Sequence, residues 1–184
     1  MTCSALLIID VQHSFLHQPF WDEAEVPAFQ TALLSLIEQC RQREVLLIDV
    51  FHIGKAWPFT RDSGLIERLP FLTHQPAATF YKHVHNALTD SGLEEWLRQK
   101  QVDHLIIAGM RTEQCCETTA RVASDLGFSV TFVTPATLTF PMTHGGITLD
   151  STELKHRTET VLIDRFARIS DVEGCIQSLD ATDA

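Results

Sequence analysis

The chain has 184 residues, of which 45% are hydrophobic and 21% charged, a composition typical of an ordinary globular protein. Asp and Glu (24) outnumber Lys and Arg (14), which gives a formal net charge of −10. No cluster of basic residues is present, so we expect neither nucleic acid nor a membrane surface as a partner. No apolar run approaches the ~18 residues that span a bilayer.

The five cysteines do not have the spacing of a disulfide framework, and the N-terminus carries neither the basic region nor the cleavage site of a signal peptide. We therefore expect a reduced, cytoplasmic protein. The length is that of a single domain, which we predict over residues 1–184.

The first half of the chain contains near-continuous apolar runs of the kind found in strands buried on both faces. The predicted elements are a strand at Ala5–Val11, a helix from Pro27 to about Arg43, strands at Val45–Phe51 and Thr79–Lys82, and a helix around Leu93–Leu97. A long irregular stretch, His52–Pro76, separates the second and third strands, and loops of this length are usually functional.

The second half continues the alternation of strands and helices. The predicted elements are a strand at Leu105–Ala108, a helix from about Cys116 to Gly127, a strand at Val130–Val133, a loop at Pro135–Thr148, a helix from the capping box of Asp150 and Glu153 to about Asp164, a weak strand at Ala167–Ile169 and a last helix from Asp171. This βαβ order predicts an α/β fold, doubly wound around a mostly parallel sheet.

Three chemically reactive side chains follow or close the predicted strands: Asp10, Lys82 and Cys115. In doubly wound folds ligands bind outside the carboxyl ends of the strands, so these side chains are expected at one edge of the sheet. A carboxylate can take the proton of a thiol, and an ammonium group can stabilise the thiolate. Each residue alone has an ordinary alternative: a turn cap, a solvated lysine and a buried cysteine that only fills space.

Cys115 lies where a loop becomes a helix. Unpaired backbone N–H groups and the positive end of a helix dipole lower the pKa of a cysteine. We therefore expect the pKa of Cys115 to be lowered. Its neighbour Cys116 is expected to pack in the core.

Two motifs, I-D-V-Q-H-S-F around Asp10 and G-M-R-T-E-Q-C-C-E-T-T-A-R-V-A-S-D-L-G-F from Gly109, together with Lys82, resemble the isochorismatase-like cysteine hydrolases. The resemblance implies a Rossmann-like six-stranded sheet and an Asp–Lys–Cys triad of Asp10, Lys82 and Cys115. It further implies amide cleavage through a thioester without a cofactor, and a homodimer or homotetramer. It also implies a cis peptide between Met110 and Arg111, with the backbone N–H groups of Arg111 and Cys115 as an oxyanion hole.

The substrate is expected to be a small amide or carbamoyl compound. The loop residues expected near it are Gln12, Phe15, Trp21, Trp57 and Phe59. The aromatic rings among them either stack on a planar substrate or pack the loops or a subunit interface.

Two other functions remain open. Nicotinamidases carry an Asp-x-His motif for a metal, whereas here Asp49 and His52 have a different spacing and are followed by His74, so no metal is expected. A non-catalytic member of the fold would instead use Cys115 as a redox-sensing thiol.

Overall fold

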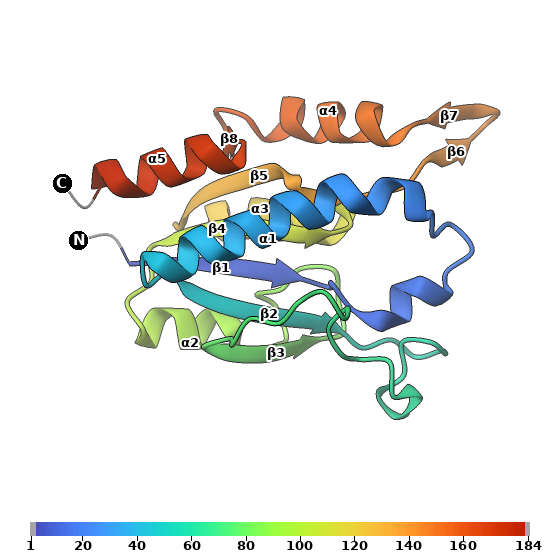
Figure 1. Ribbon diagram of the computed structural model, residues 1–184, viewed down its shortest axis with the longest axis horizontal. Helices are drawn as coiled ribbons and strands as arrows, with labels where there is room; N and C mark the ends of the chain where they lie inside the picture. The colour runs from blue at the N-terminus through green and yellow to red at the C-terminus, as the bar shows by residue number, and fades with distance from the viewer. Residues whose placement is uncertain (1–2, 183–184) are drawn as a thin grey trace.

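A computed structural model describes residues 3–182 and shows a six-stranded sheet in the order β3-β2-β1-β4-β5-β8, in which every neighbouring pair is parallel (Figure 1). The strands are β1 (Ser4–Ile9), β2 (Leu46–His52), β3 (Ala78–Lys82), β4 (His104–Met110), β5 (Ser129–Leu138) and β8 (Arg168–Ser170). The helices are α1 (Val26–Gln42), α2 (Leu93–Gln99), α3 (Glu117–Asp125), α4 (Ser151–Leu162) and α5 (Val172–Thr182). The predicted α/β fold with a doubly wound parallel sheet is confirmed.

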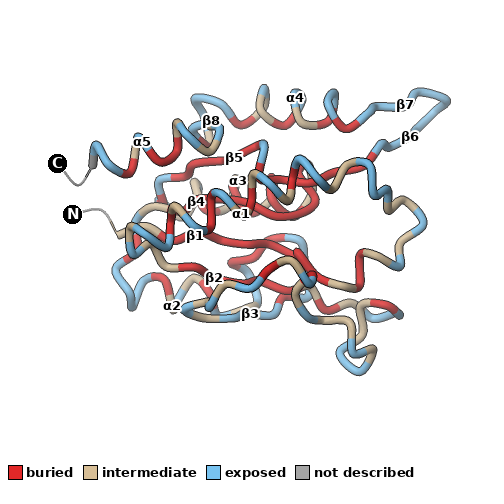
Figure 2. Tube along the Cα trace, in the orientation of Figure 1, coloured by how far each residue is buried: buried red, intermediate tan, exposed pale blue. Residues whose placement is uncertain are grey.

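The sheet is the middle layer, as the apolar runs predict. Alternate residues of β1 enter two separate cores: Leu6 and Ile8 pack with α1 and α5, whereas Leu7 and Ile9 pack with α2 and α3. Figure 2 accordingly shows the central strands buried along their length while the outer sides of the helices are exposed. Within residues 3–182, no helix is long and apolar enough to span a membrane.

The chain winds outward from β1 to β2 and β3, then returns to add β4, β5 and β8 on the other side of β1. Neighbouring strands β1 and β4 are therefore the point where the winding direction reverses. Their carboxyl ends diverge into loops that leave in opposite directions, which opens a crevice at this edge of the sheet.

The largest differences from the predicted elements lie between Val133 and Leu149. Strand β5 continues past Val133 to Leu138, and the segment predicted as a loop contains an antiparallel hairpin of β6 (Met142–His144) and β7 (Ile147–Leu149). The strand tolerates Pro135 because the pairing of β5 with β4 resumes only at Thr137 after a bulge, so no ladder hydrogen bond is needed from the proline. The hairpin is exposed along its length and extends from the body of the molecule (Figures 1 and 2).

Candidate active site

Asp10 lies directly after β1 and is completely buried. Its φ of 57° lies in the left-handed region, which turns the chain out of the strand. The neighbouring strand makes room for this turn at Gly109, whose φ is 120°. A Cβ atom there would lie 2.1 Å from the backbone oxygen of Ile9. The glycine therefore lets β1 and β4 approach closely immediately before the two loops that carry Asp10 and Cys115.

Lys82 is the last residue of β3 and is also completely buried. Its Nζ donates to Oδ2 of Asp10 at 2.8 Å and lies 3.4 Å from Sγ of Cys115. Burial alone lowers the pKa of a lysine, but the charge of Asp10 and the hydrogen bonds to Asp10 and Cys115 outweigh it and raise the pKa of Lys82. The lysine is therefore an ammonium that joins the carboxylate and the sulfur, and the three predicted residues are brought together.

Cys115 lies in a π-helical turn, Thr112–Cys116, that leads into α3. The prediction of a lowered thiol pKa is wrong. Burial raises the pKa of Cys115, the charge of Asp10 raises it further, and Lys82 opposes them only in part. A helix N-terminus lowers the pKa of a thiol that water can reach, whereas this thiol is only 6% exposed and close to a carboxylate. Cys115 is consequently a neutral thiol at rest.

The peptide bond between Met110 and Arg111 is cis, the geometry that the resemblance implies. The Arg111 side chain is buried, and its guanidinium donates to the carbonyl oxygen of Phe140 at 2.9 Å. It also lies over the ring of Phe20 at 4.6 Å and 3.3 Å from the carboxylate of Glu113. Burial lowers the pKa of Arg111. These contacts fix the turn between β4 and Cys115 against the segment that follows β5.

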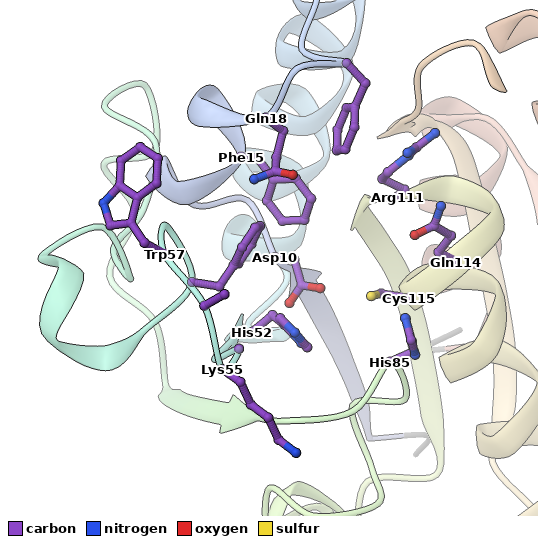
Figure 3. Close-up of a pocket in the computed structure, with 14 residues that line it drawn as sticks. Asp10, Phe15, Gln18, His52, Lys55, Trp57, His85, Arg111, Gln114 and Cys115 are labelled. Atoms are coloured by element: carbon purple, nitrogen blue, oxygen red, sulfur yellow. The ribbon is translucent and has the colours of Figure 1, made fainter. Parts of the chain in front are cut away.

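A pocket of about 420 Å³ opens above Asp10 and Cys115 (Figure 3). Three of the five predicted pocket residues line it: Phe15, Trp57 and Phe59. The rings of Phe15 and Phe59 meet edge to face with centroids 5.0 Å apart, and Trp57 is 64% exposed. The aromatic residues therefore form one wall of the pocket from its interior to its rim.

The other two predicted pocket residues are not in the pocket lining. Gln12 is completely buried, and its side-chain amide exchanges two hydrogen bonds with the backbone of His52, at 2.7 and 3.0 Å. Trp21 donates its indole N–H to Glu23 at 2.7 Å and packs against Phe140. Both side chains make contacts within the protein, and the prediction that they line the pocket is wrong.

Several residues that line the pocket were not predicted from the sequence, among them Gln18, Phe20, His52, Lys55, His85 and Gln114. His52 was considered only as a metal ligand, although it closes β2 and lies opposite Lys82 in the register of β2 and β3. The strand-end argument that selected Asp10 and Lys82 applies equally to His52. The position of His85, in the loop after β3, carries no comparable signal.

Across residues 3–182, no group of three or more His, Cys, Asp or Glu side chains could hold a metal ion. Asp49 and His74, considered above as metal ligands, form a buried hydrogen bond of 2.9 Å, and Arg68 lies 3.5 Å from the same carboxylate. His52 instead belongs to the pocket beside Lys82. The side chains considered as metal ligands therefore lie in two separate places, Asp49 and His74 in one and His52 in the pocket.

Comparison with known proteins identifies the family. The model of the isochorismatase domain matches residues 4–173, which is most of the chain. The chain belongs to the isochorismatase family. It is 30% identical over 192 residues to Nicotinamidase 3 of Arabidopsis thaliana, covering 96% of this chain and 88% of that protein.

One further relative and one solved structure match this isochorismatase-family protein over nearly their whole length. YrdC of Bacillus subtilis, an uncharacterised isochorismatase family protein, is 24% identical, with 97% of each chain covered. The crystal structure of a cysteine hydrolase from Pseudomonas syringae superposes with a TM-score of 0.87 at 18% identity, covering 97% of this chain and 93% of that one. The family and its fold are therefore established, and the protein is a hydrolase of this family.

Proposed function

We propose that the protein hydrolyses a small amide or carbamoyl compound through a thioester on Cys115. The observation that carries the proposal is the buried Asp10–Lys82 ion pair, whose ammonium nitrogen lies 3.4 Å from the cysteine sulfur beneath an open pocket. Burying two charges carries a desolvation cost, so a buried ion pair by itself is weak evidence that the pair stabilises the fold. Next to a thiol, it supplies both a proton acceptor and a cation for the thiolate.

The reaction begins with transfer of the thiol proton to Asp10. Oδ2 of Asp10 is occupied by Lys82, whereas Oδ1 has no hydrogen-bond partner among the described residues and is free to accept. The resulting thiolate is stabilised by the Lys82 ammonium and attacks the amide carbon. The backbone N–H groups of Arg111 and Cys115 are the proposed donors to the tetrahedral oxyanion.

Asp10 then returns the proton to the amine nitrogen as the carbon–nitrogen bond breaks, and ammonia or an amine leaves. A water molecule next gives a proton to Asp10 and attacks the thioester. As the acid leaves, Asp10 returns this proton to the sulfur, which restores the thiol. The sum is one amide and one water converted into one acid and one amine. No residue beyond the three is required for proton transfer.

The test is ammonia release from a panel of small amides, ureas and carbamoyl compounds. The panel begins with nicotinamide because a relative is a nicotinamidase. Release should be abolished in Cys115→Ala protein and retained in Cys116→Ala protein, the matched control, since Cys116 is completely buried in the core. Release that continues in Cys115→Ala protein at the native rate would refute the proposal.

A further inference from the structure

The Lys82 ammonium has more polar neighbours than it has protons. An ammonium group has three N–H donors and no acceptor. Its nitrogen lies 2.8 Å from Asp10, 3.2 Å from the carbonyl of Val84, and 3.4 Å from both Nδ1 of His52 and Sγ of Cys115. If Asp10 and Val84 each accept one N–H, the remaining N–H is shared between His52 and Cys115.

This arrangement assigns the tautomer of His52. Because Lys82 only donates, a hydrogen bond between Lys82 and His52 requires Nδ1 to accept, which places the proton of the neutral ring on Nε2. The ring is neutral because burial lowers the pKa of His52, and the charge of Lys82 lowers it further. His85 acts in the same direction, whereas Asp10 and the Val84 carbonyl oppose it without reversing the shift.

The ring of His52 is held in place in the pocket wall. Its backbone is held by two hydrogen bonds, one donated by the Gln12 amide and one accepted by it, and its ring meets that of Phe59 edge to face with centroids 5.8 Å apart. Figure 3 shows the ring below Asp10, on the side of the pocket that faces Cys115 and His85. The N–H on Nε2 is thus presented to the pocket, beside Gly54, by a rigid element.

We propose that His52 is a substrate-positioning residue, with Nδ1 held by Lys82 and Nε2–H donating to an acceptor on the substrate other than the carbonyl that Cys115 attacks. This inference rests on the proposed hydrolysis and narrows its substrate class. The substrate is an amide with a second hydrogen-bond acceptor, such as a ring nitrogen or another carbonyl oxygen. The aromatic wall of Phe15 and Phe59 suits a flat body that carries both groups.

The first experiment compares benzamide with the three pyridinecarboxamides, which have the same shape but place an acceptor nitrogen at each ring position in turn. Dissociation constants are measured by calorimetry in Cys115→Ala protein, where turnover does not interfere. At least one pyridinecarboxamide should bind about fivefold or more tightly than benzamide, the effect of one hydrogen bond. His52→Phe should abolish this preference.

Two variants on the same background serve as controls. His52→Gln places an amide N–H near the position of Nε2 and should retain part of the preference. His83→Gln changes an exposed histidine that pairs with Asp90 outside the pocket lining, and should leave the preference unchanged. Equal binding of all four compounds, or a preference that survives His52→Phe, would overturn the inference.

The second experiment reads the tautomer directly from the ¹⁵N chemical shifts of the His52 ring at neutral pH. The expected result is a neutral ring protonated on Nε2; protonation on Nδ1, or an imidazolium, would overturn the assignment.

The two proposals fail separately. If ammonia release depends on Cys115 but no binding preference is found, only the role of His52 is refuted. If the binding preference is found but no compound gives Cys115-dependent ammonia release, only the proposed hydrolysis is refuted.

Discussion

The most informative perturbation is to remove one charge of the buried ion pair between Asp10 and Lys82. Both side chains are fully buried, so Lys82→Met leaves a carboxylate without its counter-charge, and Asp10→Asn leaves an unpaired ammonium. Breaking such a pair costs about 3–5 kcal/mol. Asn also tolerates the left-handed backbone at this position, where φ is 57°, so the second variant adds little strain.

The double variant Asp10→Asn/Lys82→Met removes both charges. It should be more stable than either single variant, because two neutral side chains in the same volume avoid the desolvation of an isolated ion. Urea unfolding of the four proteins should therefore give a coupling free energy of about 3 kcal/mol or more.

A matched cycle on the exposed pair Glu38–Arg41 provides the control, since both of its side chains are about half exposed and the coupling should be far smaller. Losses of stability at Asp10 and Lys82 that simply add in the double variant would show that the two buried charges do not stabilise each other. All variants at the buried pair should be inactive, whatever their stability.

Three further predictions follow from the site and its supports. Asp10→Asn removes a negative charge that raises the pKa of the Cys115 thiol. The pH midpoint for alkylation of Cys115 by iodoacetamide should therefore fall by about one unit, while turnover is lost. An unchanged or higher midpoint would contradict this prediction. Gly109→Ala should prevent soluble folding because its Cβ would overlap the backbone of β1, whereas Gly127→Ala, with φ of 86° and open space around it, should cost about 1 kcal/mol in thermal unfolding. Gln12→Ala should lower the free energy of unfolding in urea by about 2–4 kcal/mol, because it leaves two backbone groups at the end of β2 unpaired. A loss below about 0.5 kcal/mol would contradict this structural role of Gln12.

The positions of Asp10, Lys82 and Cys115 were predictable because the fold itself brings them together. Apolar runs such as Ala5–Val11 mark strands buried on both faces, and parallel strands with a reversal in winding order converge at their carboxyl ends. Nothing about long-range contacts has to be known for this step. The capping box of Asp150 and Glu153 was predictable for a similar reason, because its two hydrogen bonds are local.

The predictions that were wrong concern features set by contacts between residues far apart in the sequence. The pKa of Cys115 is set by burial and by a carboxylate far away in the sequence, and helix position alone gives the wrong sign. Gln12 follows a strand as a ligand-binding residue would, but its side chain turns inward to the backbone of His52. The continuation of β5 through Pro135 depends on a bulge that only the pairing with β4 reveals.

Mass spectrometry of the protein quenched in acid during turnover tests directly whether Cys115 carries the acyl group. We expect an adduct with the mass of the acyl group, located on Cys115 by peptide mapping, and a burst of ammonia equal to the adduct in amount. The adduct should be absent from Cys115→Ala protein. Turnover without an adduct at any quench time, and at a rate unchanged by Cys115→Ala, would show that no acyl group passes through Cys115.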